Sequence, residues 1–261
     1  MTTITGSRLP TAKEQDDVLV VDGLRKSFGS VHAVKEASIR LPRGKVTALI
    51  GDNGAGKSTL IRCLCGVHKP DGGTVELDGQ PVSFHSPTQA RDAGIETVHQ
   101  NLALVDDLTV WQNLFLGREK TRGFGPVQLL DRRGMRSQAK EMVSALAINV
   151  PSVTSRVRRL SGGQRQAVSI ARAAGWGSKI VIMDEPTAAL GVQETARVED
   201  LIRGLRDSGM TILLISHNFD QIMRIADGVW AMRAGKSVGY RNVADTTGQE
   251  LVGLVTGAIP A

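Results

Sequence analysis

Aromatic side chains and long apolar runs are scarce in this sequence. Phe, Trp and Tyr together make up 3% of the 261 residues, which leaves few rings on which the bases of single-stranded nucleic acid can stack. No apolar run approaches the ~20 residues that a membrane-spanning helix needs. The opening MTTITGSRLPTAKEQDD lacks the apolar stretch of a secretory signal peptide. We therefore expect residues 1–17 to be a flexible tail and the protein to be cytosolic.

Cysteine is also rare, since Cys63 and Cys65 are the only two in the chain. They lie on an expected helix, and residues at this spacing point in different directions. The spacing therefore argues against a disulfide or a metal-binding pair. Reduced thiols, buried or half-buried in a cytosolic protein, fit the pattern better.

Positive charge exceeds negative charge, giving a net charge of +6 and a pI of about 9.6. Such a surplus suits nucleic acid, anionic lipid or phosphate ligands. The basic residues are spread along the chain instead of gathering in one arm, and aromatic residues are few. We therefore expect no nucleic-acid partner, and the positive charge fits phosphate ligands better.

Short apolar segments alternate with helical patterns along most of the chain. The segments 45–50, 179–184 and 210–216 are apolar and short, as the buried strands of a parallel sheet are. Between them, residues 192–207 repeat apolar side chains at helical spacing: Val198, Leu201, Ile202 and Leu205. This alternation predicts an α/β core built on a parallel sheet.

Two other regions complete the expected architecture. Strand-like segments lie at 18–21, 37–41, 74–79 and 95–100, the third ending in an Asp-Gly turn. Helical patterns dominate about 86–160, which opens with Ser86-Pro87, a suitable N-cap and first helical residue. Within it, a loop is marked by Gly123, Gly125 and Pro126. We expect one domain over 18–245 with a helical subdomain inserted at about 86–160, and a C-terminal helix or tail at 246–261.

The segment GDNGAGKST (residues 51–59, the P-loop) matches a phosphate-binding pattern. An apolar strand precedes it and a helical stretch follows it, as that pattern requires. Its glycines let backbone N–H groups surround a phosphate, and the side chains can assist: Lys57 at the β- and γ-phosphates, Ser58 at Mg²⁺ and Thr59 at the α-phosphate. The alternative is a tight glycine turn with an incidental lysine. The predicted nucleotide contacts are Gly51, Asp52, Asn53, Gly54, Ala55, Gly56, Lys57, Ser58 and Thr59.

Two adjacent carboxylates follow the apolar strand at 179–184. Asp184 stands at the strand's carboxyl end, where ligands bind in open α/β sheets, and a carboxylate there can hold Mg²⁺ through water. Glu185 comes next, and we predict that it orients or deprotonates the attacking water. The alternative is a pair of acids that ends a strand at a turn.

A second glycine-rich segment, LSGGQRQ (residues 160–166, the signature motif), precedes the helical run AVSIARAA. Free N–H groups and the positive end of the helix dipole collect at such a helix start, which favours an anion. Ser161 can also act as an ordinary N-cap, which is worth about 1 kcal/mol. The two roles are compatible.

Taken in order, the P-loop, Gln100, the signature motif, IVIMDEP and His217 in LLISHN resemble the ATPase subunit of an ATP-binding cassette (ABC) transporter, over roughly residues 18–240. The resemblance implies a P-loop NTPase (RecA-like) core with a parallel sheet, an N-terminal antiparallel β part and an inserted helical subdomain. It implies ATP and Mg²⁺ as cofactors and head-to-tail pairing of two subunits. Ser161 and Gly163 would then hold the γ-phosphate bound by the partner's Lys57, within a cross-dimer contact made by Ser161, Gly162, Gly163 and Gln164.

The resemblance assigns roles to three further residues. Phe28 would stack on adenine, although a core phenylalanine is the alternative. Gln100 would contact Mg²⁺ and the attacking water and sense the membrane partner, or simply end a strand. His217 would contact the γ-phosphate, or be a surface histidine. The remaining histidines have no such context, and we interpret them as solvated or structural: His32, His68, His85 and His99.

The segments GIETVHQNLALVDDLTVWQNLFLGRE (94–119) and DEPTAALGVQET resemble the sugar-importer branch of the family, in particular importers of monosaccharides. That branch implies transmembrane permease subunits, an indirectly acting solute-binding protein, a homodimer or a second cassette, and a place on the cytoplasmic face of the membrane. An ABC ATPase for another substrate class, or one without a transport role, stays open.

The resemblance to the family also implies that a short helix of the membrane subunit docks near residues 102–117. Apolar residues at helical spacing occur there: Trp111, Leu114 and Phe115. We expect part of this segment to be an exposed apolar groove, with core packing as the alternative for each residue.

One position departs from the family pattern, because Gly191 replaces the aspartate that usually crosses the dimer interface. We expect looser coupling between the two ATP sites as a result. The substitution Gly191→Asp should therefore increase the cooperativity of ATP hydrolysis, measured as the Hill coefficient of the rate against ATP concentration. An unchanged Hill coefficient would count against this interpretation.

Overall fold

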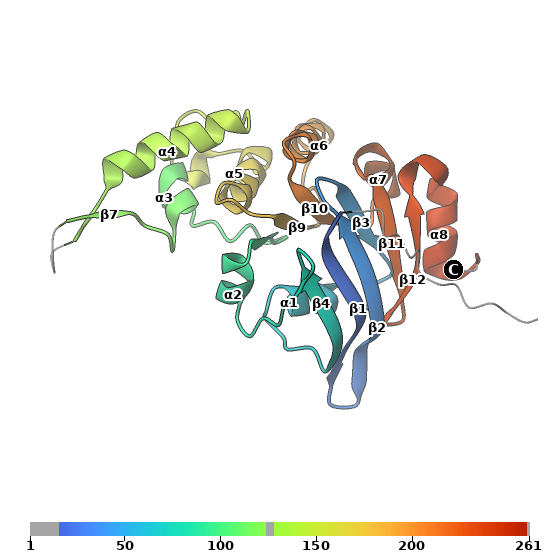
Figure 1. Cartoon of the computed structure of the whole chain (residues 1–261). Coiled ribbons are helices and arrows are strands. Elements are labelled where there is room, and N and C mark those ends of the chain that lie inside the picture. The colour runs from blue at the N-terminus through green and yellow to red at the C-terminus, as the bar shows by residue number, and fades with distance from the viewer. Residues whose placement is uncertain (1–15, 124–127, 260–261) are drawn as a thin grey trace, which may run out of the picture.

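A single curled sheet dominates the computed structural model, which describes residues 16–123 and 128–259 (Figure 1). Its ten strands follow the order β5-β4-β1-β2-β12-β11-β3-β10-β9-β6. The strands are β1 (Asp17–Phe28), β2 (Val31–Pro42), β3 (Val46–Ile50), β4 (Gly72–Leu77), β5 (Gln80–Pro81), β6 (Ile95–Val98), β9 (Ile180–Asp184), β10 (Thr211–Ile215), β11 (Gly228–Arg233) and β12 (Lys236–Asn242). Most of the tail expected at residues 1–17 lies outside the described residues, and Asp17 already belongs to β1.

The parallel half of the sheet is its most buried part. Strand β3 pairs in parallel with β10 and β11, and β9 pairs in parallel with β10 and β6. Every residue of β3 and β10 is buried, as expected for strands covered on both faces. The strands predicted at 45–50, 179–184 and 210–216 are confirmed to within one residue at each end, and so is the α/β core.

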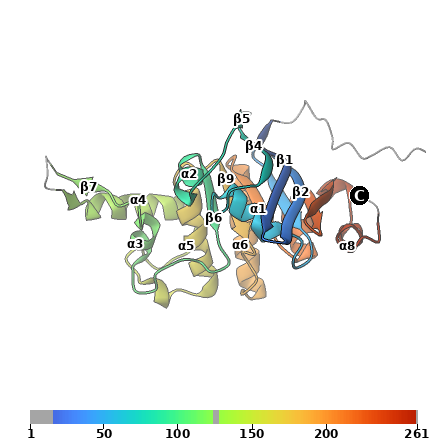
Figure 2. The ribbon, with the colours of Figure 1, turned by 90° about the horizontal axis from the view of Figure 1, so that it is seen from below.

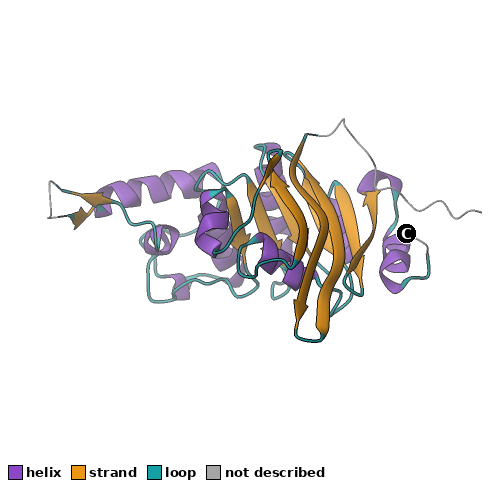
Figure 3. Ribbon diagram, turned by 60° about the horizontal axis from the view of Figure 1, so that its bottom comes forward, coloured by secondary structure: helices purple, strands orange, loops and turns teal. Residues whose placement is uncertain are grey.

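The antiparallel half is formed by β1, β2, β4 and β5 (Figure 3). Strands β1 and β2 are longer than the segments predicted at 18–21 and 37–41, because their pairing continues to Phe28 and Val31 beside the turn. Strand β12 was not specifically predicted. Its sequence, KSVGYRN, lacks an apolar run, and its place is fixed by antiparallel pairing with β11.

Helices cover both faces of the parallel half. Leu60 and Leu64 of α1 pack in one core with β1, β2 and Leu49 of β3. The opposite face of β3, which carries Val46 and Ile50, packs in cores that include α6, α7 and α8. The helices are α1 (Lys57–Leu64), α2 (Pro87–Asp92), α3 (Val110–Phe115), α4 (Arg132–Ala145), α5 (Gly162–Ala174), α6 (Val192–Asp207), α7 (Phe219–Ile225) and α8 (Gly248–Thr256). Each helix in the described ranges is too short or too polar to cross a lipid bilayer.

The helical part lies beside the sheet, with α3, α4 and α5 next to one another (Figures 1 and 2). It has its own apolar core, which includes Val110, Met135 and Val168. The short strands β7 (Thr121–Arg122) and β8 (Leu129–Leu130) pair with each other. The loop predicted around Gly125 and Pro126 lies outside the described residues.

The segment between α1 and α3 also follows the sequence pattern. Helix α2 begins as predicted, since the Ser86 hydroxyl accepts a hydrogen bond from the Gln89 N–H. It packs with β6, which pairs with β9 in the main sheet. The strand predicted at 95–100 is thus present as β6 and belongs to the main sheet, although it lies within the range of about 86–160 assigned to the helical subdomain.

Three apolar residues of α3 are predicted to line an exposed groove, and this prediction is wrong for all three of them. Trp111 is 6% exposed, and Leu114 and Phe115 are each 1% exposed. Together they fill the core of the helical part, which was the alternative left open by the sequence. The exposed apolar residues in this segment are Val105 and Leu116, each 43% exposed.

The neighbours Phe115 and Leu116 allow a matched test of this packing. The substitution Phe115→Ala should lower the free energy of unfolding by about 3–5 kcal/mol, because it leaves a cavity in a closed core. The substitution Leu116→Ala should change it by only about 0.5 kcal/mol, as is usual for exposed positions. Urea unfolding measures both values, and equal losses at the two positions would contradict the assignment of Phe115 to the core.

Candidate active site

One edge of the sheet carries the P-loop, Gln100, Asp184, Glu185 and His217, because four neighbouring parallel strands end there. Strand β3 leads into the P-loop, and β9 ends at Asp184, which Glu185 follows. Strand β10 is followed by Ser216 and His217, and β6 by Gln100. These strands lie side by side in the order β3-β10-β9-β6, and carboxyl ends of parallel strands share one edge. The fold therefore brings together segments that are far apart in the sequence.

Glycine is required in the P-loop by the backbone and by its neighbours. Gly51, Gly54 and Gly56 have φ values of 151°, 82° and 100°, a region that other residues rarely adopt. A Cβ on Gly51 would lie 2.3 Å from the Met232 carbonyl oxygen, and one on Gly56 would lie 2.6 Å from the Ala33 carbonyl oxygen. The P-loop is therefore packed tightly against the strands below it.

Lys57 lies at the centre of the site. Its Nζ donates hydrogen bonds to the carbonyl oxygens of Gly51 and Asp52, at 2.5 Å and 3.1 Å. Burial lowers the pKa of Lys57, and the negative charges of Glu185, Asp52 and Asp184 oppose that shift. The ammonium group is thus held inside the P-loop, within reach of the carboxylates at the end of β9.

The first turn of α1 faces the same edge. Ser58 is exposed and Thr59 is half-buried, and both follow the N-cap residue Gly56, which supplies no side-chain hydrogen bond. The N–H groups of this turn consequently remain available to an anion. The alternative of a glycine turn with an incidental lysine does not explain why Lys57 points back into the P-loop.

Asp184 and Glu185 have different surroundings although they are adjacent. Burial raises the pKa of Asp184, and the charge of Glu185 raises it further, while His99, Lys57 and Arg62 act in the opposite direction. Glu185 has a φ of 50°, which is uncommon for a residue other than glycine and marks local strain.

The Glu185 side chain is fixed by His217. Glu185 Oε1 lies 2.8 Å from His217 Nδ1, and the Glu185 N–H donates to the Ile215 carbonyl oxygen at 2.9 Å. The imidazole is 73% exposed, whereas the carboxylate is 25% exposed. The two predicted catalytic side chains are therefore in direct contact, with His217 on the solvent side.

A buried polar network behind this pair was missed by sequence reasoning. The Gln221 side chain accepts from the Ser216 hydroxyl at 2.9 Å and donates to the Thr187 hydroxyl at 2.8 Å. It thereby links the segment after Glu185 to the segment before His217. Gln221 itself is fully buried, and a glutamine on the inward face of a predicted helix is the signal that could have revealed it.

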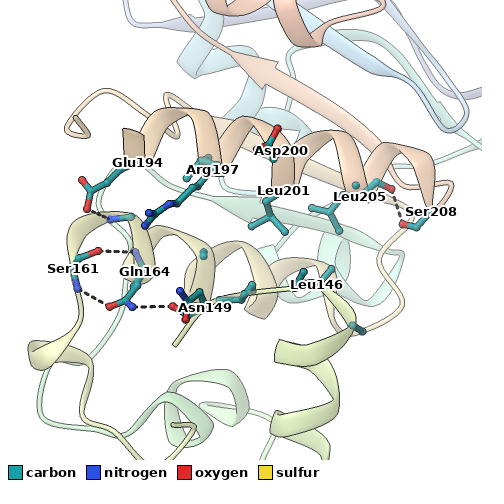
Figure 4. A pocket seen from close by; sticks show the side chains of 17 residues that line it. Leu146, Asn149, Ser161, Gln164, Glu194, Arg197, Asp200, Leu201, Leu205 and Ser208 are labelled. Atoms are coloured by element: carbon teal, nitrogen blue, oxygen red, sulfur yellow. Dashed lines mark hydrogen bonds between the residues drawn. The ribbon is translucent and has the colours of Figure 1, made fainter. Parts of the chain in front are cut away.

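The signature motif forms the capped start of α5 (Figure 4). The Ser161 hydroxyl accepts from the Gln164 N–H at 3.3 Å, and the Gln164 side chain accepts from the Ser161 N–H at 3.0 Å. Gln164 also donates to the Asn149 carbonyl oxygen at 2.8 Å. In the described ranges, no hydrogen bond or ion pair joins these residues to the P-loop.

The remaining predicted residues are accessible. Phe28 is 45% exposed, so it is not a core phenylalanine, and its ring meets the His68 ring edge-on with centroids 5.0 Å apart. Gln100 is exposed. Of the histidines interpreted as solvated or structural, His68 contacts Phe28, and the exposed His99 opposes the rise in the pKa of Asp184.

Comparison with known proteins agrees with this geometry. Residues 34–188, more than half of the chain, match the family model described as "ABC transporter". The chain belongs to the ABC transporter family. Within that family it is an ATP-binding cassette, a nucleotide-binding ATPase.

Relatives in this family align with nearly the whole chain. The xylose/arabinose import ATP-binding protein of Sulfolobus acidocaldarius is 42% identical, with 92% of this chain and 94% of that protein covered. The fructose import ATP-binding protein of Rhizobium meliloti is 46% identical, with 94% and 95% covered. A ribose import ATP-binding protein of Rhizobium etli is 43% identical, but this chain covers only 46% of its length.

The fold is also that of solved ABC cassettes. A nucleotide-free ATP-binding cassette from an ABC transporter superposes with a TM-score of 0.75 at 25% identity, covering 92% of this chain and 95% of that one. A cassette in its ADP conformation gives the same values. The P-loop NTPase fold class predicted from the sequence is therefore confirmed.

Two P-loop glycines provide a matched test of the phosphate cradle. Both Gly54 and Gly56 have positive φ, but a Cβ on Gly54 meets nothing within 4 Å, whereas one on Gly56 meets the Ala33 carbonyl oxygen at 2.6 Å. The substitution Gly54→Ala should cost about 1–2 kcal/mol of backbone strain. The substitution Gly56→Ala should also displace the P-loop. It should therefore weaken nucleotide binding roughly tenfold more than Gly54→Ala does, which corresponds to about 1.4 kcal/mol.

Titration with a fluorescent ATP analogue measures the affinities of these two variants, and urea unfolding measures their stabilities. Equal nucleotide affinities would show that the contact between Gly56 and Ala33 does not shape the cradle.

Proposed function

We propose that this chain is the ATP-hydrolysing subunit of an ABC importer that takes up a monosaccharide. The observation that carries the proposal is the shared edge of the sheet, where the P-loop, Asp184, Glu185 and His217 meet. Relatives named as import ATP-binding proteins for xylose/arabinose and for fructose support the sugar assignment, because they align with this chain almost end to end.

The phosphates of ATP bind the P-loop and the first turn of α1 in this proposal. Backbone N–H groups of residues 51–59 and the ammonium of Lys57 neutralise the phosphate charge, and Thr59 contacts the α-phosphate. Lys57 exchanges its bonds to the Gly51 and Asp52 carbonyl oxygens for bonds to phosphate oxygens. Phe28, exposed at the end of β1, offers its ring to the adenine.

Mg²⁺ fits the oxygen donors that the fold brings to this edge. The proposed ligands are the Ser58 hydroxyl, the Gln100 amide oxygen and the Asp184 carboxylate, all hard oxygens of the kind Mg²⁺ prefers. Burial and the neighbouring Glu185 raise the pKa of Asp184, so a bound cation would favour its ionised form. When bound, the ion would neutralise charge on the β- and γ-phosphates.

Glu185 is the proposed general base. Its carboxylate is held by His217 Nδ1 at 2.8 Å and by a strained backbone, so it is oriented before the substrate arrives. It accepts a proton from the water that attacks the γ-phosphate. His217, on the solvent side of Glu185, contacts the γ-phosphate itself, and Gln100 positions the water from the end of β6.

A second copy, or a second cassette, completes each site. The signature residues Ser161 and Gly163 bond to α6 and to their own helix instead of the P-loop of the same chain. We propose that they contact ATP bound to the partner, so that ATP closes the dimer and hydrolysis reopens it. The cassettes lie on the cytoplasmic face of the membrane, and this cycle changes the conformation of the permease subunits. A solute-binding protein delivers the sugar to those subunits.

Residues 18–245 form one ATPase domain in this proposal, and 246–261 form a C-terminal segment that contains α8.

Removing the general base tests this assignment. The substitution Glu185→Gln should lower the rate of ATP hydrolysis by roughly 10²–10⁴-fold and should trap an ATP-bound dimer, because nucleotide still binds. The exposed Glu141 on α4 provides the control, since Glu141→Gln removes the same charge away from the site. Phosphate release and sedimentation with ATP measure the two effects, and hydrolysis at the parental rate would rule out Glu185 as the base.

The import role needs its own experiment. The chain should co-purify with a permease, and vesicles containing both should take up a radiolabelled monosaccharide only with ATP and a solute-binding protein. Uptake of another substrate class by the same vesicles would keep the ATPase assignment and overturn the sugar assignment.

A further inference from the structure

One carboxylate lies between the starts of two helices. Glu194, in the first turn of α6, accepts a hydrogen bond from the Gly163 N–H in the first turn of α5, at 3.2 Å (Figure 4). Hydrogen bonds from the Gly163 N–H, the Ser161 hydroxyl and the Gly191 N–H lower the pKa of Glu194. The positive ends of both helices thus stabilise the same negative charge.

The packing at this contact is close. A Cβ on Gly163 would lie 3.0 Å from the Glu194 Cβ and 3.1 Å from its Cγ, so the stem of Glu194 covers the glycine. Gly191, the N-cap of α6, offers no side chain of its own. Glu194 is therefore the carboxylate that contacts the signature motif, through its hydrogen bond from the Gly163 N–H.

Ser161 and Gly163 are the two groups that the proposed function assigns to the γ-phosphate of the partner's ATP. A hydrogen-bond donor engaged by a carboxylate cannot bind a phosphate oxygen fully at the same time, and two anions at one helix start repel each other. The γ-phosphate can therefore reach this position only if the Glu194 carboxylate moves away.

The structure offers a place for the displaced side chain. Next to the contact is a groove of about 460 Å³ between α4, α5 and α6, whose lining includes Arg197, Ala167 and Leu201. Arg197 lies three residues after Glu194 on the same helix, a spacing at which opposite charges pair, and its charge already acts on Glu194. A rotation of Glu194 toward Arg197 would free the Gly163 N–H.

We propose that Glu194 is an internal competitor of the γ-phosphate, which occupies the signature motif until a partner subunit presents its ATP. This inference rests on the proposed function, since it needs the signature motif to contact the partner's nucleotide. Its consequence is a threshold: the competing carboxylate raises the ATP concentration needed to close the dimer. A residue that merely held the signature motif in place would have the opposite effect, because its loss would weaken closure.

The test uses the full chain with Glu185→Gln, so that ATP is not consumed, and measures by light scattering the ATP concentration that gives half-maximal dimer. Adding Glu194→Gln, which removes the charge but keeps the side-chain length, should lower this concentration roughly three- to tenfold, since charged hydrogen bonds are about twice as strong as neutral ones. The matched control is Asp200→Asn, on the same helix and groove, whose carboxylate instead bonds Arg203; it should leave the concentration unchanged.

A second measurement does not depend on dimer formation. Hydrogen exchange of the Gly163 amide without nucleotide should become faster with Glu194→Ala than in the parent, and should be unchanged with Asp200→Asn. An unchanged or higher ATP requirement with Glu194→Gln would overturn the competitor role while leaving the proposed function intact. If none of the variants dimerises with ATP, both the competitor role and the proposed function fail together.

Discussion

The parallel pairing of β3, β10, β9 and β6 is the constraint on which the rest of the site depends. The pairing puts residues 51–59, 100, 184–185 and 217 at one edge. No local feature of the sequence could bring these segments together. The helices on both faces keep β3 and β10 fully buried, so the strands cannot shift without exposing apolar surface. Chemistry at the edge is therefore held in place by the hydrophobic core beneath it.

Lys57 and Asp184 place opposite charges at this edge, and each is partly buried. Burial lowers the pKa of Lys57 and raises that of Asp184, so each group alone would be less stable in its charged form. Their mutual attraction opposes both shifts. A site of this kind favours a ligand that brings both signs of charge, and a nucleotide with a divalent cation does so. The same reasoning explains the signature motif, where Glu194 supplies the negative charge that two helix starts favour.

Features that depend on a few adjacent residues could be predicted from the sequence. The P-loop, the N-cap at Ser86, the capped start of α5 and the central strands were all found from local patterns, because backbone conformation and burial follow from them directly. The side of α3 that becomes core could not be predicted: Trp111 and Phe115 face α4 and α5, and which partner covers an apolar helix face is a property of the tertiary fold. Strand β12 and the Gln221 network depend on pairing with distant segments for the same reason. Glu194 was missed because only the packing of α5 against α6 brings it to Gly163.

The central claim is that the P-loop of one chain and the signature motif of another make one ATP site. The most direct measurement is a complementation assay with two variants, Lys57→Ala and Ser161→Glu, each of which should be inactive alone. A mixed dimer has one intact site, formed by the P-loop of the Ser161→Glu chain and the signature motif of the Lys57→Ala chain. An equal mixture should recover roughly a quarter of the parental ATPase rate, because half of the dimers are mixed and each has one working site of two. A mixture as inactive as its components would contradict the account.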